Sequence, residues 1–107
     1  GAAYMDINRV SVETGIKEIV LQEIIQLAKQ NNVEKVILFG SRARGDFKER
    51  SDIDLAFRGG HRSYFVLDVD EMTSTLLEFD IVDLDMPVKE ELLESIKSEG
   101  VVLYEKI

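Results

Sequence analysis

Hydrophobic and polar positions follow a helical period in the first third of the chain. From residue 12 to residue 30 the apolar side chains recur every three or four positions, which predicts one amphipathic helix of this length. Ser11 has the side chain of an N-cap, and Asn31 and Asn32 mark the expected end. Gly15 lies inside the first turns and weakens them by about 1 kcal/mol relative to alanine. The side chains expected to face the core are Ile16, Ile19, Val20, Ile24, Leu27 and Ala28.

Three short apolar runs have the length and composition of buried strands. They cover about residues 35–39, 52–58 and 79–84, and the glycine pair at 59–60 ends the second run. A fourth segment, residues 101–104, is long enough to add a short edge strand. Because helices are expected between the strands, the pattern predicts an α+β fold in which helices pack against a small sheet.

The segment from residue 61 to residue 77 fits two structures. Residues 64–67 taken alone fit a strand, whereas a helix over the whole segment separates its apolar side chains from its acidic and hydroxyl side chains. We therefore favour the helix. Its apolar face would consist of Phe65, Val69, Met72 and Leu76.

A final helix is expected after the third strand. Asp85 is its expected N-cap, Pro87 suits its first turn, and Gly100 is placed to end it. Its inward-facing side chains are expected to be Leu92, Leu93 and Ile96.

The composition describes a small acidic chain without cysteine. Its 107 residues suffice for one domain with one modest core, and we expect residues 5–107 to form it, with residues 1–4 as a remnant before a native Met5. Without cysteine there are no disulfides, and the lack of a signal-peptide pattern or a long apolar run favours a cytoplasmic protein without a membrane segment. The net charge of −8 argues against general nucleic-acid binding, which depends on neutralising phosphates.

The apolar run at residues 36–39 leads into Gly40 and Ser41, where the chain is expected to turn. Glycine lets another group approach the backbone, the start of a short helix around Ala43 and Arg44 offers free N–H groups, and Ser41 adds a hydroxyl. These features predict a phosphate-binding site. Basic side chains also exceed acidic ones between residues 42 and 62, and they are Arg42, Arg44, Lys48, Arg50, Arg58 and Arg62.

Asp52 and Asp54 lie two positions apart in the second predicted strand. Alternate residues of a strand share one face, so these carboxylates are expected about 6.5–7 Å apart along the chain, beside the phosphate site. Together the two features predict a site for a nucleoside triphosphate and its magnesium ions. A P-loop is excluded because Asp46 stands where that motif needs lysine, and an EF-hand loop is excluded because Phe57 takes the place of its glycine.

The third predicted strand carries two acids, Asp80 and Asp83, on opposite faces. Only one of them can share a face with Asp52 and Asp54. Three carboxylates on one face repel one another strongly unless cations lie between them. Two Mg²⁺ ions about 3.5–4 Å apart are the usual arrangement for phosphoryl transfer at such a cluster.

The order Gly40-Ser41, ten further residues, then Asp52-x-Asp54 resembles the signature of the DNA polymerase β-like nucleotidyltransferases. Residues 40–45 and 51–55 are similar in detail to the minimal nucleotidyltransferase (MNT) branch of this superfamily. The resemblance implies a palm-like nucleotidyltransferase fold with a mixed sheet and two Mg²⁺ ions. It also implies transfer of a nucleoside monophosphate, with AMP from ATP as the expected case, to a hydroxyl group with release of pyrophosphate.

The resemblance also implies roles for individual residues. Asp80, and not Asp83, matches the third metal-binding position, so Asp52, Asp54 and Asp80 are the expected catalytic and metal-binding set. Ser41 matches the serine that holds the terminal phosphates, and Gly40 before it belongs to the same nucleotide-binding motif. Arg42 and Arg44 are both candidates for an additional clamp on the triphosphate, because a guanidinium suits phosphate through bidentate hydrogen bonds.

Minimal members of this superfamily commonly act together with a HEPN-type RNase toxin. The resemblance therefore implies an antitoxin that adenylylates a tyrosine of such a partner. Two alternatives stay open: a catalytically idle antitoxin that only masks its partner, and a small-molecule nucleotidyltransferase of the aminoglycoside-modifying kind. In the enzymatic cases a homo- or hetero-oligomer would complete the acceptor side of the site.

Overall fold

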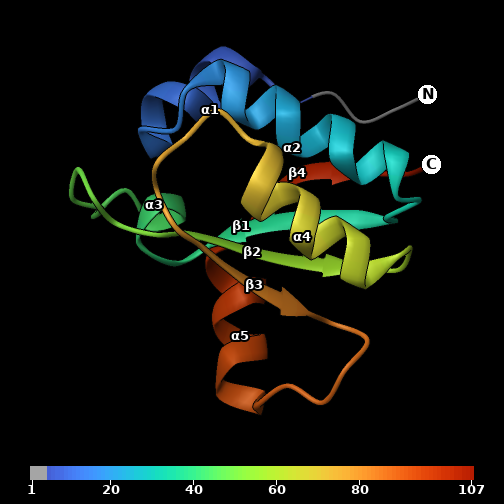
Figure 1. Ribbon diagram of the computed structural model, residues 1–107. Coiled ribbons are helices and arrows are strands. Elements are labelled where there is room, and N and C mark those ends of the chain that lie inside the picture. Colours follow the sequence, from blue (N-terminus) through green and yellow to red (C-terminus); the bar gives the residue numbers. More distant parts are fainter. Residues whose placement is uncertain (1–4) are drawn as a thin grey trace.

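The computed structural model describes residues 5–107, so the remnant expected at residues 1–4 lies outside the described residues. Within that range the chain is an α+β fold built on a four-stranded mixed sheet, as predicted (Figure 1). None of the helices in the described range is long and apolar enough to cross a bilayer.

The strands follow the order β3-β2-β1-β4 across the sheet. β1 (Lys35–Phe39) lies antiparallel to both β2 (Ile53–Arg58) and β4 (Val101–Glu105), whereas β2 and β3 (Phe79–Asp83) are parallel. The three predicted strands are confirmed within one residue at each end, and the fourth segment forms an edge strand as expected. The sheet therefore brings the end of β1, the start of β2 and the start of β3 to one end of the molecule (Figure 1).

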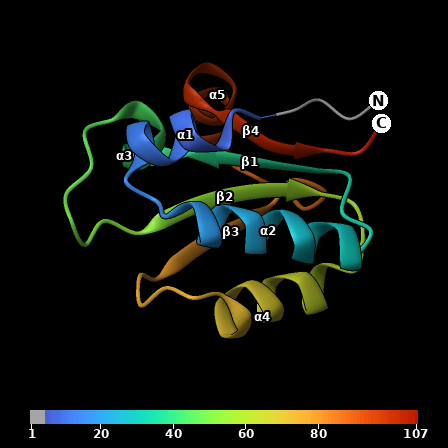
Figure 2. The ribbon, with the colours of Figure 1, turned by 90° about the horizontal axis from the view of Figure 1, so that it is seen from above.

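Helices cover both faces of the sheet. α2 (Glu18–Gln30) and α4 (Arg62–Met72) lie side by side on one face, over the larger part of the core, and α5 (Glu90–Glu99) packs on the other face (Figure 2). α3 (Gly40–Arg44) follows β1 directly and contacts α1 (Ile7–Thr14). The smaller cluster under α5 contains Phe39, Ala56 and Ile96.

The single helix predicted over residues 12–30 is wrong, because the chain forms α1 and α2 with a break at Gly15. Gly15 has a φ of +67° and ends α1 in the left-handed conformation, which glycine adopts without the strain that a Cβ introduces. Asp6, not Ser11, caps α1 by accepting the Arg9 N–H at 3.2 Å. Ile19, expected in the core, is half exposed on α2.

The helix predicted over residues 61–77 ends at Met72, and the strand alternative for its start is excluded. Phe65 and Val69 are fully buried as expected, but Met72 and Leu76 are exposed. Thr73 is already extended, with a φ of −95° and a ψ of 152°. Beyond it Glu23 of α2 accepts both the N–H and the hydroxyl of Ser74 at 2.7 Å, which holds the chain outside the helical path.

The last helix begins at Glu90, later than predicted from Asp85 and Pro87. Asp85 does not cap it, because its carboxylate accepts the N–H of Gly59 at 2.7 Å and so holds the turn after β2. Gly100 ends the helix as expected. Of the three side chains expected to face inward, Ile96 is buried and Leu92 and Leu93 are half-buried.

Candidate active site

The turn at the end of β1 is pressed against a carboxylate of β2. Phe39 pairs with Asp54 across the two antiparallel strands, which places the Asp54 side chain directly over Gly40. Gly40 has a φ of +76°, and a Cβ at this position would overlap the Oδ2 atom of Asp54. Glycine is therefore required here both by its backbone conformation and by the close approach of the acid.

The parallel pairing of β2 and β3 sets Asp80 beside Asp54. The pKa of Asp54 is raised from 3.8 to about 6. Burial is the largest cause, repulsion by the Asp80 and Asp52 carboxylates acts in the same direction, and Arg44 opposes the change. Asp80 and Asp52 thus each lie close enough to Asp54 to repel its charge. Within residues 5–107, however, no three acidic or histidine side chains already form a group ready to hold a metal ion.

Asp83 lies on the other face of the sheet. It pairs with Phe57 in the register of β2 and β3, and its carboxylate accepts from the Arg62 side chain at 3.4 Å and from the Asp85 N–H at 2.9 Å. Of the two acids on the third strand, Asp80 is the one that neighbours Asp54.

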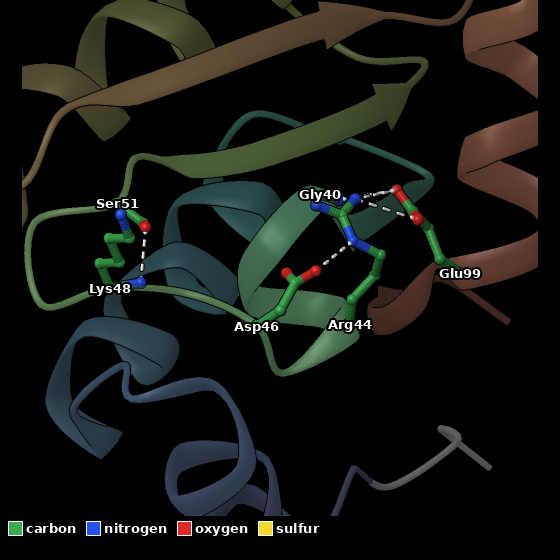
Figure 3. A network of polar contacts seen from close by, with 6 residues as sticks. All are labelled: Gly40, Arg44, Asp46, Lys48, Ser51 and Glu99. Carbon is green, nitrogen blue, oxygen red and sulfur yellow. Dashed lines mark hydrogen bonds and ion pairs between the residues drawn. The ribbon is translucent and has the colours of Figure 1, made fainter.

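Ser41, Arg44 and Glu99 surround the same turn. Ser41 is the second residue of α3 and is half-buried. Arg44 donates from Nε to Asp46 at 3.1 Å and from Nη1 to both oxygens of Glu99 at 3.2 Å (Figure 3). The Gly40 N–H also donates to Oε1 of Glu99, at 3.1 Å. A cation and a backbone donor therefore meet beside the carboxylates.

Sequence patterns did not identify Glu99 as part of this site. It lies 55 positions from Arg44. The one local hint is its place in the last turn of α5, where the negative end of the helix dipole disfavours an acidic residue.

Arg42 points away from these groups and into the protein. Its side chain is 2% exposed, and its guanidinium donates to three backbone oxygens while lying 4.9 Å from the centre of the Phe47 ring. Burial lowers its pKa, and attraction to Asp52 opposes that change. Arg42 thus ties the loop that leads into Asp52 to the end of α1. Its acceptors are the carbonyls of Thr14 at 2.9 Å, Ser51 at 2.9 Å and Glu49 at 3.1 Å.

Comparison with known proteins gives matches over most of the chain. The family model described as polymerase beta nucleotidyltransferase matches residues 22–107. A protein of Methanocaldococcus jannaschii, provisionally named a protein adenylyltransferase, is 35% identical over 101 residues, which cover 86% of this chain and 97% of that protein.

Solved structures with the same fold are more distant in sequence. A crystal structure of a toxin–antitoxin with AMP-PNP is 23% identical, with a TM-score of 0.66 over 80% of this chain and 73% of that one. A provisionally named nucleotidyltransferase of Sulfolobus solfataricus is 20% identical, with a TM-score of 0.55 over 97% of this chain and 91% of that one. These likenesses confirm the fold.

Proposed function

Because the chain belongs to the polymerase β nucleotidyltransferase family and is therefore a nucleotidyltransferase, we propose that it transfers AMP from ATP to a hydroxyl group of a protein. The observation that supports this most is the contact between the Gly40 turn and Asp54, with Asp80 beside it. A turn that carries hydrogen-bond donors and a set of acids beside it are the two parts that nucleotidyl transfer needs. The name of the Methanocaldococcus relative supports a protein as the acceptor.

The acids of the site fit a divalent cation. Their donor atoms are all carboxylate oxygens, which Mg²⁺ prefers. A bound cation would offset the repulsion among the acids and so lower the raised pKa of Asp54. We propose that Asp52, Asp54 and Asp80 hold Mg²⁺. When bound, the metal supplies neutralisation of phosphate charge and activation of the acceptor hydroxyl.

The remaining residues of the site bind and orient the triphosphate. We assign the terminal phosphates to the Gly40 N–H, the Ser41 hydroxyl and the Arg44 guanidinium, which is 44% exposed and so accessible to a ligand. In the reaction the acceptor oxygen gives its proton to solvent water and bonds to the α-phosphorus. The bond from that phosphorus to the bridging oxygen breaks, and pyrophosphate leaves. Most of the catalysis in such a transfer comes from positioning and charge stabilisation.

We further propose that the acceptor is a tyrosine of a HEPN-type RNase toxin and that the chain acts as its antitoxin. The support is the shared fold with proteins crystallised as toxin–antitoxins, one of them with AMP-PNP. The deciding experiment incubates the purified protein with MgCl₂, labelled ATP and the toxin. A mass increase of one AMP on a toxin tyrosine, absent with Asp54→Ala, is the expected result.

A catalytically idle antitoxin is the second candidate, because the acids in the described range are not already arranged as a metal-binding group. This candidate predicts a stable complex and inhibition of the toxin without nucleotide. The variant that carries both Asp52→Ala and Asp54→Ala separates the two. If it neutralises the toxin as well as the parent does, and no AMP is added in the parent reaction, masking is the mechanism.

A further inference from the structure

Glu99 accepts from two of the donors assigned to the terminal phosphates. Its Oε1 takes the Gly40 N–H at 3.1 Å, and its two oxygens take Nη1 of Arg44 at 3.2 Å (Figure 3). A carboxylate and a phosphate are both anionic acceptors, so they compete for the same N–H groups. In the free protein, these contacts are made by the protein's own acid.

The end of α5 is held in place by its backbone contacts, so only the Glu99 side chain would have to move to release the two donors. The Gly100 N–H donates to the Ile96 carbonyl at 2.9 Å, and a Cβ on Gly100 would lie only 2.6 Å from Cγ2 of Ile37 in β1. The backbone at Gly100, the residue after Glu99, is therefore packed closely against the sheet. The Glu99 side chain keeps 19% of its surface exposed, and displacing the carboxylate requires a change of side-chain rotamer rather than a movement of the helix.

The position of Glu99 is electrostatically unfavourable apart from these contacts. The last turn of a helix disfavours negative charge, and the Glu99 carboxylate adds to the repulsion felt by Asp54. Its ion pair with the half-exposed Arg44 adds little to folding, because water screens such pairs. An acid placed here is therefore better explained by ligand binding than by stability.

We propose that Glu99 is a positioning residue that sets nucleotide affinity by competition: it occupies the Gly40 and Arg44 donors in the free protein, and the terminal phosphates of a triphosphate must displace it. This inference rests on the proposed function, since it assumes that phosphates reach these two donors. It predicts that the donors stay oriented for a ligand and that only a ligand with terminal phosphates overcomes the carboxylate.

Titration calorimetry with Glu99→Ala tests the competition. The dissociation constants of ATP and of inorganic tripolyphosphate, in MgCl₂, are expected to fall by about tenfold or more, because Glu99→Ala removes a charged competitor from two donors. Glu99→Gln, which keeps the shape without the charge, should lie between the parent and Glu99→Ala. AMP lacks the terminal phosphates, so its affinity should not change.

Glu94→Ala is the matched control, because it removes the same charge from an exposed position of the same helix. Its affinity for ATP should stay near that of the parent. A role confined to folding would make Glu99→Ala less stable without tighter binding, so unchanged or weaker binding of both ligands overturns the competition. If the parent binds ATP but transfers no AMP, the proposed function fails, and the affinities of the parent and Glu99→Ala still test the competition. Failure of the parent and Glu99→Ala alike to bind either ligand overturns both.

Discussion

Asp54→Asn should make the free protein more stable, even though it removes a group proposed for catalysis. The pKa of Asp54 is raised from 3.8 to about 6 by burial and by its acidic neighbours, so ionising this carboxyl disfavours the folded state. A change of this size corresponds to about 3 kcal/mol as an upper limit. Because water screens part of a half-buried carboxylate, we expect Asp54→Asn to gain about 1–2 kcal/mol at pH 7.

The sign of the pH dependence follows from the raised pKa. The stability conferred by the protonated carboxyl is fully present below pH 3.8 and is lost as the pH rises through about 6. The advantage of Asp54→Asn over the parent should therefore be small at pH 4 and grow towards pH 7. The charged groups that act on Asp54 besides burial are Asp80, Asp52, Arg44 and Glu99.

Urea denaturation in EDTA, followed by far-UV circular dichroism because the chain has no tryptophan, measures this difference at both pH values. Glu94→Gln removes the same charge from an exposed site and corrects for the general relief of a net charge of −8. Adding MgCl₂ should stabilise the parent more than Asp54→Asn. The reasoning is refuted if Asp54→Asn is less stable than the parent at pH 7, or if its advantage does not depend on pH.

The remaining predictions concern three further parts of the site. Ser41→Ala should raise KM for ATP more than it lowers kcat, because terminal phosphates are held in ground and transition states alike; steady-state kinetics would contradict this if kcat alone fell. Arg42→Met should lower the free energy of unfolding by about 3 kcal/mol, because it leaves buried carbonyls without a hydrogen-bond donor, and denaturation measures this. Arg44→Met should mainly weaken ATP binding, which calorimetry measures. Asp80→Asn should reduce AMP transfer by orders of magnitude and Asp83→Asn should not, and equal losses in a transfer assay would invalidate the choice of Asp80.

The local pattern of the sequence was enough to place the strands and the main parts of the candidate site. Alternation in strands and the helical spacing of Phe65 and Val69 reflect burial on one face, which depends on near neighbours in the chain. The order of Gly40, Asp52 and Asp54 pointed to the same end of the sheet for a similar reason. A turn after one strand and acids at the start of the next meet whenever the two strands pair antiparallel.

Only the tertiary structure decided the features that depend on contacts between distant parts of the chain. From the sequence, Arg42 and Arg44 were equivalent candidates for a clamp on the triphosphate. In the structure Arg42 donates to Thr14, 28 positions away, whereas Arg44 pairs with Glu99, 55 positions away. The register of β2 and β3 set Asp80 beside Asp54. The break of the first predicted helix at Gly15 came likewise from the left-handed turn that the fold requires there, where Phe47 and Arg42 approach the backbone. Residue spacing determines which side chains share a face, whereas the packing of distant segments determines which of them meet.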